Sequence, residues 1–179
     1  MKVHFGVSRI ELVRGDLVQQ QVEAIVNAAN AELAGGGGVD GAIHRAAGPT
    51  VMAETQTRYP LGCPTGDAVA TSAGQLAAKF LFHAVGPIWR GGREHEADLL
   101  RSSHRRALQL AAKHDCASIA FPAISTGASG FPVDLAAEYA LDETRTFLLN
   151  HPDPLVVRFV LFDAGTYAAF ARVLDEFVE

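Results

Sequence analysis

Four consecutive glycines, Gly35–Gly38, separate a short apolar run from a segment that looks helical. Backbone that carries no side chains lets a ligand approach the main-chain N–H groups closely. The helix that follows turns its positive end toward the same place, which suits a phosphate. A flexible surface loop is the alternative, although most loops do not need four glycines between a strand and a helix. The glycines therefore favour an α/β fold with an anion site at this crossing.

Apolar runs of strand length alternate with helical segments along the chain. Strands are expected at residues 2–7, 9–13, 24–28, 80–85, 118–123 and 155–162. Helices are expected at residues 39–47, 49–59, 96–114, 132–149 and 167–178. This order predicts an α/β fold with a largely parallel sheet between layers of helices. The length of 179 residues suits a single domain, 1–179, without a linker.

Three polar or glycine-rich segments each follow a predicted strand. They are Asn27–Asn30, Gly35–Gly38 and Ser125–Gly130. Ligands of open α/β sheets lie outside the carboxyl ends of the strands. We therefore expect these segments to meet at one rim of the sheet and to form a single site.

Charge and composition exclude several classes of protein. The net charge of −5, without a basic cluster, argues against nucleic-acid binding. No apolar run reaches the roughly 20 residues that a membrane-spanning helix needs. Cys63 and Cys116 are too few for a disulfide framework. We expect a cytoplasmic protein that binds neither nucleic acid nor membrane, and a monomer.

Familiar catalytic motifs match poorly. Gly36–Gly41 fits the dinucleotide pattern G-x-G-x-x-G, but Ala29–Ala34 intervene between the strand and the first glycine. No P-loop lysine is present, and Gly127–Phe131 lacks the last glycine of a nucleophile elbow. The seven histidines show no metal-ligand spacing. We therefore expect neither a metal nor a cofactor.

Five polar residues near these loops each have a structural and a functional interpretation. An unsatisfied amide at Asn27 would cost about 1–3 kcal/mol, so it bonds either nearby backbone or a ligand hydroxyl. Asn30 could stabilise a turn. Asp40 is either the N-cap of the helix or a general base beside a phosphate, with His44 one turn further on the same face. Asp16 is either a cap or an acceptor for an exocyclic amino group. Together they favour a functional site.

Five segments carry a resemblance to a known family. They are Gly15–Asp16, Ile25–Asn30, Gly35–Gly48, His83–Pro87 and Ala120–Gly127. In this order they resemble the macrodomain family, specifically its MacroD-type branch. The resemblance runs over nearly the whole chain, and the central block is long and highly specific. It implies a three-layer α/β/α sandwich with a mixed, largely parallel sheet and an ADP-ribose site.

The resemblance also implies a role for each residue of that site. Asp16 would accept a hydrogen bond from the adenine amino group near the backbone of Leu17, and Phe162 would stack on adenine unless it is a core aromatic. Asn27 and Asn30 would orient the distal ribose. The diphosphate would be held by the backbone of Gly37, Gly38, Val39, Ser125, Thr126, Gly127, Ala128, Ser129 and Gly130.

Members of this branch remove ADP-ribose from modified acidic side chains and deacetylate O-acetyl-ADP-ribose. Asp40 corresponds to the catalytic aspartate of the family and His44 to a supporting residue. Asp40 and a diphosphate oxygen would position and activate one water, without a metal or cofactor. The expected partners are therefore ADP-ribose, its esters and mono-ADP-ribosylated proteins.

The chain departs from the family pattern at Ser129, where an aromatic residue usually flanks the distal ribose; the nearest aromatic here is Phe131. This change puts the rate and substrate preference in doubt, and it favours somewhat a reader module that binds ADP-ribose without turnover. The presence of Asn30, Asp40 and His44 together favours the hydrolase, which is the leading hypothesis. A smaller departure is Leu17–Val18, where isoleucine and threonine are common. A phosphatase acting on ADP-ribose 1″-phosphate and an RNA-binding module are further alternatives.

Overall fold

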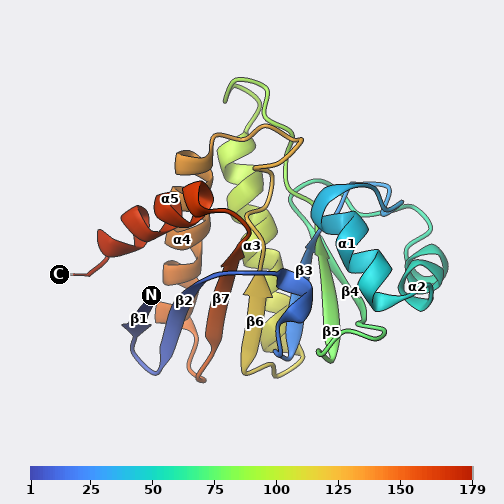
Figure 1. Ribbon diagram of the computed structural model, residues 1–179, viewed down its shortest axis with the longest axis horizontal. Helices are drawn as coiled ribbons and strands as arrows, with labels where there is room; N and C mark the ends of the chain where they lie inside the picture. The colour runs from blue at the N-terminus through green and yellow to red at the C-terminus, as the bar shows by residue number, and fades with distance from the viewer. Residues whose placement is uncertain (179) are drawn as a thin grey trace.

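A seven-stranded sheet with the order β1-β2-β7-β6-β3-β5-β4 forms the centre of the protein (Figure 1). The computed structural model describes residues 1–178. The strands are β1 (Lys2–Phe5), β2 (Ser8–Arg14), β3 (Ala24–Ala28), β4 (Ala68–Ser72), β5 (Phe80–Ala84), β6 (Ser118–Phe121) and β7 (Val156–Leu161). The helices are η1 (Leu17–Gln19, 3₁₀), α1 (Gly38–Ala47), α2 (Thr50–Arg58), α3 (Glu96–Lys113), α4 (Val133–Asn150) and α5 (Ala164–Asp175).

The sheet is mixed and mostly parallel. Strands β2, β7, β6, β3 and β5 pair in parallel, whereas β1 pairs with β2 and β4 pairs with β5 in antiparallel fashion. Helices cover both faces, so the molecule has three layers (Figure 1). The predicted α/β class, with a largely parallel sheet between helices, is confirmed.

Each face of the sheet has its own apolar core. Side chains alternate between the two faces of a strand. In β3, Val26 belongs to the core shared with α3, α4 and α5, and Ile25 to the core shared with α1 and α2. In β5, Phe82 and Leu81 divide in the same way. This alternation directs Asn27, two residues after Ile25, toward α1.

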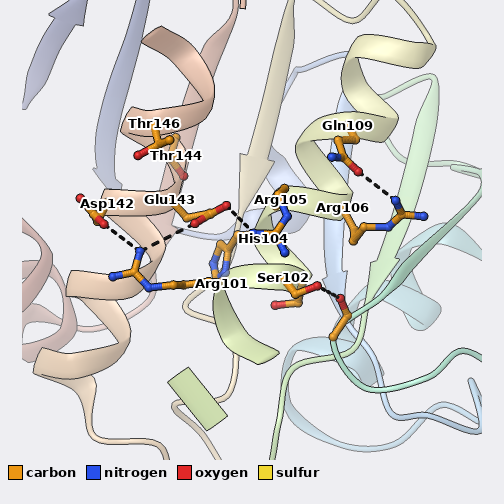
Figure 2. A network of polar contacts seen from close by, with 12 residues as sticks. Arg101, Ser102, His104, Arg105, Arg106, Gln109, Asp142, Glu143, Thr144 and Thr146 are labelled. Carbon is orange, nitrogen blue, oxygen red and sulfur yellow. Dashed lines mark hydrogen bonds and ion pairs between the residues drawn. The ribbon is translucent and has the colours of Figure 1, made fainter. Parts of the chain in front are cut away.

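Helices α3 and α4 combine a buried stripe with a charged outer surface. Leu100, Ala107 and Ala111 of α3 are fully buried, as their spacing predicts. On the outer surface, Arg105 Nη1 donates to Glu143 of α4 at 2.9 Å (Figure 2). Arg105 therefore belongs to a solvated, ion-paired helix face.

Two elements were not predicted. Strand β4 consists mainly of small residues with weak strand preference, and it forms an edge of the sheet through its pairing with β5. The turn η1 begins after Asp16, whose carboxylate caps it. Helix α5 begins three residues earlier than predicted, because Asp163 Oδ1 accepts a hydrogen bond from Thr166 N at 2.8 Å and starts the helix there.

The chain leaves the adjacent strands β3 and β6 toward opposite faces of the sheet. The connection after β3 forms α1 and α2 on one face, and the connection after β6 forms α4 on the other. Such a divergence opens a crevice at the carboxyl ends of the strands. Among residues 1–178, no helix is long and apolar enough to cross a membrane.

Candidate active site

A cavity of about 470 Å³ lies at the carboxyl end of the sheet. Its walls come from the segments that follow β2, β3, β6 and β7, far apart in the sequence. Seven of the predicted ligand-binding residues line it: Asp16, Leu17, Gly38, Val39, Thr126, Gly127 and Phe162. The other five, Gly37, Ser125, Ala128, Ser129 and Gly130, belong to the same two glycine loops but are not part of its walls. The glycine segments at Gly38 and at Thr126–Gly127 thus meet at one rim, as predicted, whereas Asn27–Asn30 are not part of the cavity walls.

Phe162 and Asp16 lie at the same side of this cavity. Phe162 is 85% exposed directly after β7, so its alternative interpretation as a core aromatic is wrong. Asp16 Oδ1 accepts a hydrogen bond from Val18 N at 3.1 Å, which makes Asp16 the cap of η1. An exposed ring and a carboxylate that both line a cavity suit an aromatic ligand with an exocyclic amino group.

The first glycine loop, Gly35–Gly38, is packed tightly against α1. Asn30 Nδ2 donates to Gly35 O at 2.9 Å, and Asn30 Oδ1 accepts from Ala34 N at 3.0 Å, which confirms its role in stabilising a turn. A Cβ on Gly41 would lie 2.4 Å from Gly36 O. Only glycine at position 41 therefore allows this loop to lie on the first turn of the helix.

Asp40 lies within the first turn of α1. The N-cap is Gly37, so the interpretation of Asp40 as the cap is wrong. The carboxylate is buried, with an exposed fraction of 7%, and points to the sheet instead of to the helix end. A negative charge is favoured there by the positive end of the helix dipole.

A cluster of buried polar side chains surrounds this carboxylate. Asn27 Nδ2 donates to Asp40 Oδ1 at 2.8 Å, and His44 Nε2 lies 3.3 Å from the same oxygen. Asn27 Nδ2 is also 3.2 Å from Nδ1 of His83, whose Nε2 is 3.0 Å from Thr71 Oγ1. The structure thus brings Asp40, Asn27 and His44 together, as predicted, and adds His83 and Thr71.

Two buried atoms of this cluster have no partner in the part of the chain that the structure describes: Asn27 Oδ1 and His44 Nδ1. Asn27 was expected to bond either backbone or a ligand. Its amide nitrogen bonds two side chains instead, and its oxygen remains free. An unsatisfied buried acceptor costs about 1–3 kcal/mol, so a free oxygen here is a candidate acceptor for a ligand hydroxyl.

His83 is a site residue that sequence reasoning missed. Burial, together with the nearby His44, lowers the pKa of His83 to about 4, so its ring is neutral at pH 7. The signal that identified Asn27, a polar residue inside an apolar strand, was also present at His83. The sequence alone did not show that the two strands are neighbours.

The second glycine loop, Ser125–Gly130, lies very close to Gly86 in the segment that follows β5. Ser125 has a left-handed φ of 69°, and its buried hydroxyl has no hydrogen-bond partner within residues 1–178. A Cβ on Gly86 would lie 2.3 Å from Ser125 Oγ, so glycine is required there. The main chain closes this loop, because Phe131 N donates to Ser125 O at 2.9 Å.

The loop 86–95 supports the second glycine loop from outside. Trp89 N donates to Ser129 O at 2.8 Å. The loop itself is held by Glu96, which accepts hydrogen bonds from Arg90 N at 2.9 Å and Gly92 N at 2.7 Å. Burial alone would raise the pKa of Glu96, but these backbone donors lower it to about 2. The Ser129 backbone is therefore anchored although its side chain is small.

Phe131 does not replace the aromatic residue that the family pattern places at position 129. Its ring is 2% exposed and packs against Trp89 at 4.8 Å and Tyr139 at 6.1 Å between ring centroids. It belongs to the core under the loop. The chain therefore has no aromatic side chain at position 129, and Phe131 does not take its place.

A family model described as Macro domain matches residues 26–140. This chain belongs to the Macro domain family. An O-acetyl-ADP-ribose deacetylase from Cronobacter sakazakii is 49% identical to this macrodomain over 173 residues, 96% of each chain. The predicted resemblance is confirmed.

Solved macrodomains have the same fold. The Oceanobacillus iheyensis macrodomain with ADP has a TM-score of 0.93 and 39% identity, covering 99% of this chain and 96% of that chain. The Trypanosoma brucei macrodomain in complex with ADP-ribose has a TM-score of 0.85 and 41% identity, covering 92% of this chain and 68% of that chain. The three-layer fold of this macrodomain is therefore that of the family.

The chemistry available in the cluster around Asp40 comes from its carboxylate, the amide of Asn27 and the imidazoles of His44 and His83. Within residues 1–178, no three His, Cys, Asp or Glu side chains gather where they could hold a metal ion. The carboxylate of Asp40 can accept a proton from a water molecule, and His44 can keep that carboxylate in place. Such a set can support hydrolysis of an activated ester.

Proposed function

We propose that this macrodomain binds ADP-ribose in the cavity and hydrolyses esters at its distal ribose. The observation that carries the proposal is the buried carboxylate of Asp40, which follows the cavity-lining residues Gly38 and Val39 directly and is contacted by Asn27 and His44. The volume of about 470 Å³ falls in the range of small-molecule sites. The names and ligands of the related proteins support the same substrate class.

Each end of ADP-ribose meets suitable groups in this arrangement. Adenine stacks on the exposed ring of Phe162, and its amino group donates to Asp16. Backbone N–H groups of the two glycine loops bind the diphosphate near the start of α1. The free oxygen of Asn27 accepts a hydrogen bond from a distal-ribose hydroxyl. Asn30 keeps the first loop closed and donates its second amide proton to the ribose.

The reaction is hydrolysis of the acyl–oxygen bond of the ester. Asp40 and a diphosphate oxygen position one water, and Asp40 accepts its proton as the water adds to the ester carbonyl. Collapse of the adduct releases the carboxylic acid, and the proton returns to the ribose oxygen. O-acetyl-ADP-ribose gives acetate in this way, and a protein modified on Asp or Glu gives back its carboxyl group.

A reader module that binds ADP-ribose without turnover is the second candidate. Ser129 and the buried Phe131 favour it, because no aromatic ring flanks the distal ribose at this point of the loop. Asp40 and His44 in contact with each other favour the enzyme.

A monomeric state and cytoplasmic residence stay predictions from the sequence.

Single-turnover release of ADP-ribose from a protein modified on glutamate tests the proposal, with O-acetyl-ADP-ribose as a second substrate. Wild type should release ADP-ribose, and Asp40→Ala should slow release by about 100-fold or more. Calorimetry with ADP-ribose should show that the variant still binds. Binding without release by wild type would make this macrodomain a reader, and full release by Asp40→Ala would refute the role of Asp40.

A further inference from the structure

His83 lies beside the proposed catalytic cluster because of the sheet register. In the parallel pair β3–β5, Asn27 is directly opposite His83, and both side chains face α1. In the antiparallel pair β5–β4, Thr71 is opposite Leu81, two residues before His83 on the same face. Three adjacent strands thus place a hydroxyl, an imidazole and an amide in a row.

The hydrogen positions in this row follow from elimination. Asn27 Nδ2 has two protons, and it is close to Asp40 Oδ1 at 2.8 Å and His83 Nδ1 at 3.2 Å. A flipped amide would instead place its oxygen against a carboxylate oxygen. Nδ1 of His83 must therefore accept a hydrogen bond, and the ring proton of a neutral imidazole must be on Nε2.

Thr71 completes this assignment. Its Oγ1 donates to Ser72 O at 2.8 Å, which leaves its lone pairs for the Nε2–H of His83 at 3.0 Å. Every donor between Thr71 and Asp40 then meets an acceptor: Asn27 donates both to Asp40 and to His83, and His83 donates to Thr71. Because both protons of the Asn27 amide nitrogen are used, its oxygen cannot turn toward Asp40 and stays directed away from this row.

We propose that His83, held by Thr71 in the Nε2–H form, is a positioning residue that fixes the amide of Asn27. Asn27 then presents Nδ2 to Asp40 and Oδ1 to a hydroxyl of the substrate. An amide between Asp40 and His83 does not pass a proton along, so the row orients the catalytic carboxylate instead of relaying protons to it. The identity of the hydroxyl as one of the distal ribose rests on the proposed function; the orientation of the amide does not.

The first test measures the tautomer of His83 without any substrate. Nitrogen NMR of protein labelled in its histidine rings reports which ring nitrogen carries the proton, and a His83→Gln spectrum identifies the signals of this residue. The expected result at pH 7 is a neutral ring with a proton on Nε2. A proton on Nδ1, or a charged ring, would overturn the proposal whether or not the protein is an enzyme.

The second test uses two substitutions that each keep half of the imidazole. His83→Asn retains an acceptor close to the position of Nδ1, beside Asn27, and His83→Gln retains a polar group that reaches toward Thr71 only. In single turnover with protein in excess, His83→Gln should lower the rate by about 100-fold, the effect of displacing a catalytic group by about 1 Å. His83→Asn should lower it by less than about 10-fold.

Urea unfolding of both variants separates positioning from general loss of structure, since both lose the same buried ring. Equal rate losses that follow the loss of stability would refute the positioning role. Should wild type bind ADP-ribose without releasing it, the proposed hydrolysis fails on its own, and calorimetry takes the place of turnover. His83→Gln should then weaken ADP-ribose binding more than His83→Asn does, and equal affinities would refute the proposal.

Discussion

Each face of the sheet buries one histidine whose pKa burial lowers to about 4, His83 under α1 and His104 on α3. Nδ1 of His104 bonds Leu100 O of its own helix at 2.8 Å, and its Nε2 has no partner within residues 1–178. Both nitrogens of His83 contact side chains of other strands, those of Asn27 and Thr71. His104 therefore bonds only within its own helix, whereas His83 links side chains of three adjacent strands.

The charged groups of the two regions differ as well. On the outside of α3 and α4, Arg101 Nη1 contacts Asp142 at 2.7 Å and Glu143 at 3.7 Å (Figure 2). These opposite charges form ion pairs at a partly exposed surface. The buried Asp40 contacts a histidine, His44, and no Lys or Arg side chain within the described residues. Paired charges of the first kind contribute little stability. The carboxylate of Asp40 is instead buried beside an amide and an imidazole.

An unpartnered buried atom is therefore not a functional signal by itself. His104 Nε2 lies among aromatic rings, with Phe121 at 5.3 Å and Phe159 at 6.2 Å between ring centroids. The amide of Asn27 bonds instead to the carboxylate of Asp40, whose Oδ2 would lie 3.7 Å from a Cβ on Gly36 in the first glycine loop. The surroundings of the atom decide between a packed core and a binding site.

The same carboxyl-to-amide change should slow hydrolysis in the cluster around Asp40 and have no effect on the outer surface of α3 and α4. This is the largest difference that we predict. Asp40→Asn should lower single-turnover ester hydrolysis by about 100- to 10,000-fold, because the amide accepts no proton from water. Asp142→Asn should leave the rate unchanged, because it weakens only the ion pairs of Asp142 with Arg101 and Arg145 at a partly exposed surface. A comparable rate loss in both variants would end the distinction between these regions.

The buried His104 should make the protein less stable in acid. Its pKa is about 4 in the folded protein and 6.5 ordinarily, so the unfolded chain binds a proton first as the pH falls below 6.5. Stability is then lost down to about pH 4, by about 3 kcal/mol at this residue. His104→Leu should reduce the loss measured by urea unfolding at pH 7 and pH 4.

The contribution of His83 has the same sign and remains in that variant, so part of the acid sensitivity should persist. Hydrolysis at pH 7 should be unaffected by His104→Leu in a correctly folded protein. A slowed reaction would show that the α3 region takes part in function as well as the cluster around Asp40.

The exposed ring at the cavity should matter for ligand affinity but not for stability. Phe162→Ala should weaken ADP-ribose binding by about 10-fold or more, since a stacked base contributes about 1–3 kcal/mol. The urea midpoint should not change, because the ring is 85% exposed. Leu149→Ala, at a residue 64% exposed on α4 and outside the cavity, is the matched control and should alter neither quantity in calorimetry or unfolding.

The smallest effect is expected in the α3–α4 ion pairs. Arg101→Met removes contacts with Asp142 and Glu143 but keeps a side chain that packs near Tyr139. The free energy of unfolding should fall by less than about 1 kcal/mol, and the difference from wild type should shrink in high salt. A loss of several kcal/mol in urea unfolding would show that this surface is far more important for stability than a surface ion pair.

Local patterns were sufficient for most elements of the fold. The strand at Ala24–Ala28 and the helix that follows the glycines were predicted almost to the residue, because hydrophobic period and glycine punctuation act over a few neighbours. Strand β4 was not predicted, because small residues such as Ala68 and Ala70 have a weak strand preference. The strand forms through its pairing with β5.

The sequence by itself determined the family, the two glycine loops and the pair Asp40–His44, because a long ordered motif and the spacing of one helical turn are local properties. Only the tertiary structure decided that Phe162 is exposed at the cavity and that His83 faces Asn27, 56 residues away in the chain. Strand register and burial depend on contacts between distant segments, and the orientation of a single amide in turn depends on that register.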